Sequence, residues 1–410
     1  MKVVHITYSD AGGAGIAAFR IHRELLNQGI ESKMLVAEKE STDENVFIIE
    51  RSPSLMYVPP KNKLIRRMMK LLRARGHFLN EKEQFEHRLK AIPANHQTFF
   101  TSPLSNYDLA RHPLVREADI IHLHWVANLI DYPSFFPNIN KPIVWTLHDE
   151  NLAFGGFHYS RDYDAFYPYY SDIEDSFLKI KASSLGQCNT IHVVALSRMM
   201  KDFYLADSCL SNRAITIIHN GIDTSTFRVI DKRIGRMIYH IPENNLVIVF
   251  CCLYLNEKRK GLSELIEALD RFNRKDITLL CIGNGHFDGK TSLDIRYTGQ
   301  ITNGDLLAMT YSCGDVFAFP SFQEAFAQTP LEAIACGLPI VAFPCSGMEE
   351  LINEKNGCLC KEFSSDALFY GLNAILGHNY DRQTLHNDIA SRFSIEKIAK
   401  KYQCLYRSIA

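Results

Sequence analysis

The stretch VFAFPSFQEAFAQTPLEAIACGLPIVAF, residues 316–343, decides the fold. A short apolar run, Val316–Phe319, is followed by a polar loop, a helical pattern and a second apolar run. Thr329 is expected to cap this helix, with Pro330 at its first position and Glu332 completing a capping box. Free N–H groups at a helix start can hold a phosphate. The stretch therefore predicts a strand–loop–helix–strand unit of a parallel sheet, with an anion site at the carboxyl edge.

The same alternation of apolar runs and helical patterns extends over nearly the whole chain. Continuous apolar runs are typical of strands that are buried on both faces of a parallel sheet. The predicted strands are Val3–Thr7, Lys33–Val36, Ile120–His124, Ile143–His148, Ile191–Leu196, Ala214–Ile218, Leu246–Leu253, Ile277–Ile282, Ile295–Thr298, Val316–Phe319 and Ile340–Phe343. The pattern restarts near residue 246, after a polar stretch that is predicted to be a linker.

This organisation predicts an α/β protein with two Rossmann-like domains whose parallel sheets face a central cleft. The predicted N-terminal domain is 1–222 and the predicted C-terminal domain is 223–393. A C-terminal helix, about 394–410, is expected to pack back on the first domain.

Composition restricts the class of protein. The 410 residues are 46% hydrophobic and 22% charged, as in globular chains long enough for two domains. The net charge of −1 gives no global attraction for nucleic acid, so no such partner is expected. The 11 cysteines form no zinc set, and neither a secretion signal nor a membrane-spanning run is visible. Reduced thiols and a cytoplasmic location are therefore predicted.

Two motifs of the first half follow predicted strands. The glycines Gly12, Gly13 and Gly15 precede a helix that is predicted over Ile16–Gln28, where the backbone can approach an anion closely. A nicotinamide-dependent oxidoreductase would carry a similar turn, so this motif alone does not select a function. Two strands end in histidines, within His122–Trp125 and at His148, which indicates a position at a cleft.

Charged residues follow two strands of the second half. Lys258, Arg259 and Lys260 suit a diphosphate, whose charge has to be neutralised as it leaves, and a solvated basic loop is the alternative. Glu324 lies in a loop after a buried strand, where a carboxylate can accept hydrogen bonds from vicinal hydroxyls. Glu332 needs no ligand if it only caps its helix.

Together these motifs resemble glycosyltransferase family four, the retaining transferases of the GT-B fold. The family's second-domain signature is matched by Pro320–Ser321, Glu324, Glu332 and Ala335–Pro339. Asn220–Asp223, Lys260–Gly261, Gly283–Gly285 and Ser346–Gly347 follow in the family's order. His124–Trp125 and Trp145–Asp149 are similar to the branch that builds bacterial surface polysaccharides such as colanic acid.

The resemblance implies transfer of a sugar, with retention, from a nucleoside-diphosphate sugar to a glycan or lipid-linked acceptor, without metal or other cofactor. It implies that Glu332 binds the ribose, that Glu324 and His148 contact the donor sugar, and that Lys260 neutralises the diphosphate. The further donor-binding residues that it implies are Gly12, Gly13, Gly15, Arg259, Gly283, Ala325, Phe326 and Ala327.

The sequence departs from the family pattern at a few positions. Tyr254 stands where the family commonly has an arginine, so Arg259 or Lys258 is expected to replace it. The other departures are Ala325 and Ala327 for glycines, Ser346 for one glycine of a pair, and Phe157 where polysaccharide relatives often have cysteine. These differences concern the donor sugar rather than the fold. The alternative functions are those of a sugar-nucleotide epimerase of the same fold, an oxidoreductase and a non-catalytic regulatory protein.

Residues 61–75 carry seven basic residues and no acidic one. Leu64, Ile65, Met68, Leu71 and Leu72 fall on one stripe at helical spacing. A basic amphipathic helix of this kind can bind an anionic membrane surface peripherally. The alternative is an ordinary helix that packs its stripe on the domain.

Overall fold

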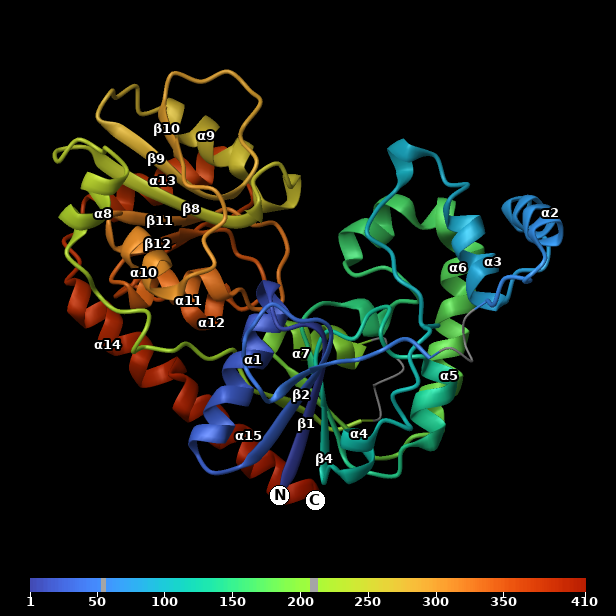
Figure 1. The fold of residues 1–410 in the computed structure, drawn as a ribbon. Helices are drawn as coiled ribbons and strands as arrows, with labels where there is room; N and C mark the ends of the chain where they lie inside the picture. Colours follow the sequence, from blue (N-terminus) through green and yellow to red (C-terminus); the bar gives the residue numbers. More distant parts are fainter. Residues whose placement is uncertain (53–56, 207–212) are drawn as a thin grey trace. The chain divides into compact units, whose positions relative to one another are not determined.

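A computed structural model describes residues 1–52, 57–206 and 213–410, which divide into two compact units (Figure 1). Unit 1 consists of Met1–Val194, Asp202–Thr216 and Tyr406–Ala410. Unit 2 consists of Ala195–Lys201 and Ile217–Leu405. The division into domains at residues 222 and 223 stays a prediction.

The seven-stranded sheet, which belongs mainly to unit 1, has the order β3-β2-β1-β4-β5-β6-β7. Its strands are β1 (Lys2–Ser9), β2 (Glu31–Glu38), β3 (Val46–Ile48), β4 (Ile120–Leu123), β5 (Ile143–Leu147), β6 (Ile191–Ala195) and β7 (Ile215–Ile217). The pairs β1–β2, β1–β4, β2–β3 and β4–β5 are parallel. The central strands β4 and β5 are buried over their whole length, which explains their continuous apolar runs.

The sheet of unit 2 has six strands in the order β10-β9-β8-β11-β12-β13. These are β8 (Leu246–Tyr254), β9 (Ile277–Asn284), β10 (Asp294–Tyr297), β11 (Val316–Phe319), β12 (Ile340–Ala342) and β13 (Gly357–Leu359), and every neighbouring pair is parallel. The two parallel sheets confirm the predicted α/β class with Rossmann-like units.

Helices connect these strands. The described helices are α1 (Gly12–Asn27), α2 (Lys63–Ala74), α3 (Glu81–Leu89), α4 (Pro113–Glu117), α5 (Tyr132–Phe135), α6 (Ser160–Gly186), α7 (Arg198–Ala206), α8 (Lys232–Ile238), α9 (Leu262–Asp270), α10 (Gly304–Ser312), α11 (Gln328–Ala335), α12 (Met348–Leu351), α13 (Ser365–Leu376), α14 (Arg382–Phe393) and α15 (Ile395–Ile409). The polar stretch 223–245, which the sequence predicted as a linker, contains α8. Within the described ranges, no helix combines the length and apolar content that crossing a membrane requires.

The helix α2 leaves its apolar stripe exposed except at Leu72, which is half-buried. Leu64 is 80% exposed, Met68 54% and Leu71 60%, and Figure 1 shows α2 on the far side of α3 from the strands of unit 1. The side chain of Arg73 instead holds the helix in place, because its guanidinium stacks on the ring of Tyr57 and forms an ion pair with Glu83. The structure therefore contradicts the alternative in which the stripe packs on the domain.

Candidate functional site

Cationic and anionic side chains meet at the carboxyl edge of the sheet in unit 2. After β8 the chain forms the short 3₁₀ helix η5 (Lys258–Lys260) and turns at Gly261, whose φ is +72°. A Cβ atom on Gly261 would lie 2.0 Å from the backbone oxygen of Pro320, so glycine is required where this turn approaches the loop after β11. This approach brings Lys260 to Glu324.

Glu324 is the centre of this group. Its Oε1 accepts hydrogen bonds from Lys260, from Arg259 at 3.2 Å and from the hydroxyl of Ser321 at 2.9 Å. Burial alone would raise the pKa of Glu324, but Lys260 and Arg259 outweigh this and hold the pKa below its usual value. Among the described residues, Oε2 of Glu324 has no hydrogen-bond partner, so it is available to a ligand.

The structure also distinguishes between the two candidates for the missing family arginine. Lys258 is exposed, whereas Arg259 is half-buried and donates to the backbone oxygen of Gln323 at 2.6 Å as well as to Glu324. Tyr254 is 54% exposed at the end of β8. Arg259 is therefore the second cation beside Lys260.

The N-terminus of α11 differs from the prediction. The helix begins at Gln328 with Ala327 as its N-cap residue, so Thr329 and Pro330 lie within the first turn and Glu332 does not form a capping box. The N-cap residue is an alanine, whose side chain cannot accept a hydrogen bond, and the first turn has no acidic residue, so this helix end can attract an anion. Glu332 is buried and accepts a hydrogen bond from the hydroxyl of Tyr311 at 3.1 Å.

Two side chains that the sequence reasoning did not assign hold the loop before α11. The amide of Asn220 donates to the backbone oxygen of Phe326 at 2.7 Å, and the hydroxyl of Ser346 donates to that of Ala325 at 3.0 Å. A contact between residues 220 and 326, which lie far apart in the chain, leaves no local signal in the sequence. Ala325, Phe326 and Ala327 thus form a fixed backbone segment between Glu324 and the helix.

Close packing of the backbone requires a glycine at position 283. It lies near the end of β9, where a Cβ atom would come within 2.0 Å of the backbone oxygen of Cys252. Its contact with a base stays a prediction.

In unit 1 the glycine motif forms the start of α1 rather than a loop before it. The helix begins at Gly12, not at Ile16, and its N-cap residue is Ala11, whose side chain cannot cap it. A Cβ atom on Gly15 would lie 2.4 Å from the backbone oxygen of Ser9, whereas a Cβ atom on Gly13 would meet no described residue beyond its own helix within 4 Å. Gly15 therefore allows α1 to approach β1 closely, and Gly13 leaves room for a ligand at the helix start.

His148 follows β5 and lines a small cavity with Trp125, Asp149 and His158. Asp149 Oδ2 accepts hydrogen bonds from the indole N–H of Trp125 and from Nδ1 of His158, both at 2.6 Å. Burial alone would raise the pKa of Asp149, but His158 and Trp125 lower it below its usual value. The cavity thus contains a fixed carboxylate beside a partly exposed imidazole.

The helix α6 holds the loop that carries Asp149 and His158. The buried ammonium of Lys181 donates to the backbone oxygens of Asn151 and Phe154 at 2.7 and 2.8 Å. The carboxylate of Glu174 accepts the N–H groups of Gly155 and Gly156 at 2.5 and 2.7 Å. Phe157, the departure from the family's cysteine, lies in this loop and is fully buried among aromatic rings.

Two family models and several known proteins are similar to this chain. A family model described as Glycosyltransferase Family 4 matches residues 11–226, and one described as Glycosyl transferases group 1 matches residues 245–378. An uncharacterized glycosyltransferase of Methanocaldococcus jannaschii is 24% identical over 312 residues, which cover 72% of this chain and 76% of the relative. A phosphatidylinositol N-acetylglucosaminyltransferase component from Homo sapiens is 22% identical over 331 residues, which cover 77% of this chain and 63% of the relative.

Among solved structures, Anabaena HepE in complex with UDP and glucose is similar, with a TM-score of 0.65, 16% identity and coverage of 100% of both chains. Sucrose-phosphate synthase from Thermosynechococcus elongatus has a TM-score of 0.64 and 18% identity, and covers 100% of this chain and 99% of its own. These likenesses confirm the GT-B fold. Because the Family 4 model alone matches more than half of the residues, the chain belongs to glycosyltransferase family 4.

Proposed function

We propose that the protein transfers a sugar, with retention of configuration, from a nucleoside-diphosphate sugar to a glycan or lipid-linked acceptor. The observation that carries this proposal is the group formed by Lys260, Arg259 and Glu324 at the carboxyl edge of unit 2. Two cations beside a helix N-terminus without a side-chain cap are a suitable binding place for a diphosphate.

The same group explains how the leaving nucleotide is stabilised. As the bond to the sugar breaks, negative charge grows on the diphosphate, and Lys260 and Arg259 together with α11 supply the compensating charge. Their cationic groups leave Glu324 when they bind phosphate, so the carboxylate becomes free to accept hydrogen bonds from the sugar. Glu332 binds the ribose hydroxyls, and the backbone of Ala325–Ala327 borders the donor.

The protein uses no metal or other cofactor in this proposal, because side chains and helix N-termini take the electrostatic role of a cation. The glycines Gly12, Gly13 and Gly15 add a second helix N-terminus to the diphosphate. His148 contacts the donor sugar. The HepE complexes with UDP and UDP-glucose support a nucleotide-sugar donor.

The exposed stripe of α2 supports an acceptor at a membrane surface. The residues Leu64, Ile65, Met68 and Leu71 are between 45% and 80% exposed, and basic side chains flank them. Such a helix lies in an anionic interface with its apolar face towards the lipid. The relative named phosphatidylinositol N-acetylglucosaminyltransferase is consistent with a lipid acceptor. The proposal therefore places the protein in the cytoplasm, peripherally on the membrane.

A panel of nucleotide-sugars tests the proposal by the release of free nucleotide with and without added glycan or lipid-linked acceptors. Release that depends on an acceptor, with the product in the same anomeric form as the donor, is expected. An epimerase would convert the donor sugar without an acceptor, and an oxidoreductase would change the absorbance of added nicotinamide nucleotide. Either of these results, or inversion at the anomeric carbon, would contradict the proposal.

A further inference from the structure

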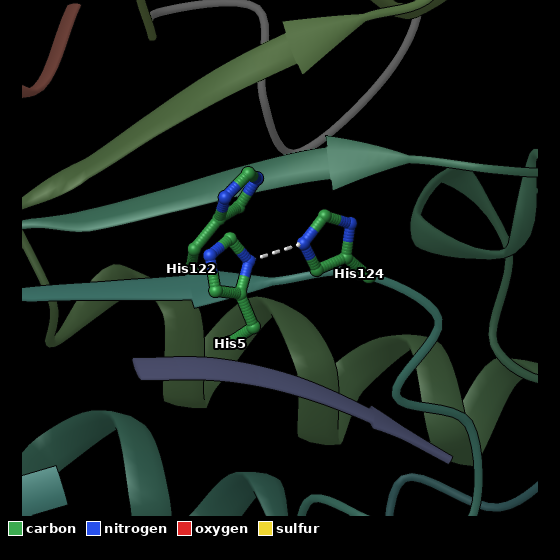
Figure 2. A group of neighbouring side chains, drawn as sticks. All are labelled: His5, His122 and His124. Carbon is green, nitrogen blue, oxygen red and sulfur yellow. Dashed lines mark hydrogen bonds between the residues drawn. The ribbon is translucent and has the colours of Figure 1, made fainter. Parts of the chain in front are cut away.

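Histidines form a buried layer on one face of the sheet in unit 1. His5 of β1 pairs with His122 of β4, and His124 lies two residues further along the chain, so the three side chains share a face (Figure 2). His148 follows β5, the next strand. His5, His122 and His124 are each at most 2% exposed, while His148 is half-buried.

Three of these rings form a continuous chain of hydrogen bonds. Nδ1 of His5 and Nε2 of His124 are 3.0 Å apart, and Nδ1 of His124 and Nε2 of His148 are 3.2 Å apart. Figure 2 shows the first of these bonds as a dashed line. Each N–H···N bond contains one proton, which comes from one ring or the other.

The number of ring protons limits the possible tautomers of the three histidines. Burial lowers the pKa of His5 and His124 well below the usual value and that of His148 to about 4, so all three rings are neutral near pH 7. A neutral imidazole has one N–H, and His124 can donate in only one direction. The chain is therefore protonated at Nδ1 in all three rings, or at Nε2 in all three.

The inner end of the hydrogen-bond chain, at His5, decides between these two protonation patterns. Nε2 of His5 is buried and has no hydrogen-bond partner among the described residues. Protonation at Nε2 would leave a buried N–H without an acceptor, whereas protonation at Nδ1 leaves only a lone pair there. Orphaned N–H groups are rarer in proteins than undersatisfied acceptors, which favours the Nδ1 arrangement.

We infer that His5 and His124 are positioning residues that fix His148 with its proton on Nδ1, so that His148 donates a hydrogen bond to a ligand oxygen. This inference rests on the proposed contact between His148 and the donor. Among the described residues, Nδ1 of His148 has no partner. A ring protonated there cannot act as a base through this nitrogen. The ligand atom is consequently an oxygen with a lone pair, in a sugar hydroxyl or in the diphosphate.

The same imidazoles meet the distance condition for a metal site, because ligand nitrogens of His5, His122 and His124 lie within 4.8 Å of one another. The hydrogen bonds of these imidazoles argue against a metal site. Both nitrogens of His122 already contact hydroxyls, Thr146 at 2.8 Å and Tyr406 at 2.6 Å, and the facing nitrogens of His5 and His124 bond each other. A metal ion would have to break these bonds.

Nitrogen NMR of the protein labelled with ¹⁵N-histidine tests the inference without any activity measurement. Two-bond correlations distinguish a ring protonated at Nδ1 from one protonated at Nε2, and single variants assign the rings. Protonation at Nδ1 is expected for His5, His124 and His148. Because free histidine in water favours the proton on Nε2, this result would not arise by default. Protonation of His148 at Nε2, or a shift of the His5, His122 and His124 signals by stoichiometric Zn²⁺, would overturn the inference.

Two variants separate positioning from general packing. In His124→Leu, His148 loses its partner, so its nitrogen signals should move to values averaged between tautomers. In the control His122→Leu, which removes a histidine of the same layer but not of the chain, the tautomer of His148 should stay fixed. If His124→Leu does not fold, the spectrum of the unmodified protein still decides. Equal signals of His148 in both folded variants would contradict the positioning role.

Calorimetry with the same variants identifies the ligand oxygen. In His124→Leu, His148 has to adopt the Nδ1 tautomer before it can donate, so binding should be weaker than in His122→Leu, by at most the worth of one neutral hydrogen bond, about tenfold. If the oxygen belongs to the sugar, the affinity for nucleotide-sugar falls and the affinity for free nucleoside diphosphate does not. If the oxygen belongs to the diphosphate, the affinity for both ligands falls. Protonation of His148 at Nδ1 without binding of any nucleotide-sugar would leave the inferred tautomer standing and refute the proposed function.

Discussion

Neutralising three cations of α2 should release the protein from anionic membranes. The variant replaces Lys63, Arg67 and Lys70 by glutamine, because these side chains are exposed. It keeps Arg66 and Arg73, which donate to backbone oxygens of residues 60, 61 and 78 and hold the helix ends. The helix itself should therefore persist, and circular dichroism would verify this.

The magnitude follows from the exposed stripe and the charges. Burying a side chain such as Leu64 or Met68 in lipid gives about 1.5 kcal/mol or more. Each basic residue near an anionic surface adds about 1 kcal/mol, so the triple variant should lose about 3 kcal/mol, or about 100-fold in partition. Raising the salt concentration should weaken the binding of the unmodified protein in the same direction.

Flotation with vesicles that contain anionic lipid measures this partition. The control variant replaces Lys90, Arg116 and Lys179, exposed basic residues elsewhere in unit 1, by glutamine, so the change in net charge is the same. The control should float like the unmodified protein. Equal flotation of all three proteins, or loss in the control as well, would refute the assignment of membrane binding to α2.

Three variants and one change of conditions test the donor site. Glu324→Gln should abolish acceptor-dependent nucleotide release while the protein stays folded. Because the pKa of Glu324 is depressed in the folded protein, its charge stabilises the fold above about pH 4.3 and this contribution is lost as the pH falls through the folded value. Acid titrations of unfolding should lack that component in Glu324→Gln, and an unchanged acid limb would contradict the ion-pair geometry. Lys260→Gln should lower the turnover by at least about tenfold and raise the KM for the donor, and normal steady-state kinetics would exclude its role at the diphosphate. Glu332→Gln should weaken nucleotide binding by about tenfold in calorimetry, with no loss of helix capping, whereas wild-type affinity would leave Glu332 a purely structural residue. Turnover in a chelator should equal that in magnesium, and a rescue by magnesium would show that a metal is needed.

The sequence predicted the central strands well because burial on both faces produces uninterrupted apolar runs. It missed β3 and β13, which are three residues long and lie at the sheet edges. β3 and β13 are defined by pairing with β2 and β12 rather than by an apolar run of their own. The predicted start of α11 was wrong for a related reason. Thr329 and Pro330 are common at a helix start, yet the packing of the preceding loop lets α11 begin earlier, at Gln328.

The donor residues were visible as motifs, but their partners were not. Lys260 and Glu324 are 64 residues apart in the chain, and only the approach of Gly261 to Pro320 brings them together. Likewise, His124 and His148 were identified as residues at strand ends, whereas His5 was overlooked because its role depends on the pairing of β1 with β4. Contacts of this kind leave no periodic signal in the sequence.

The two ends of the loop between Asp149 and His158 are tied to α6 through Lys181 and Glu174. The conformational entropy of this loop is therefore lost when the protein folds and not when a ligand arrives. A ligand that uses Asp149 or His158 meets a rigid surface, and its binding should show a small entropic penalty and only a modest change in heat capacity. Rigidity also makes selection strict, because a loop that cannot adjust rejects ligands whose shape does not fit.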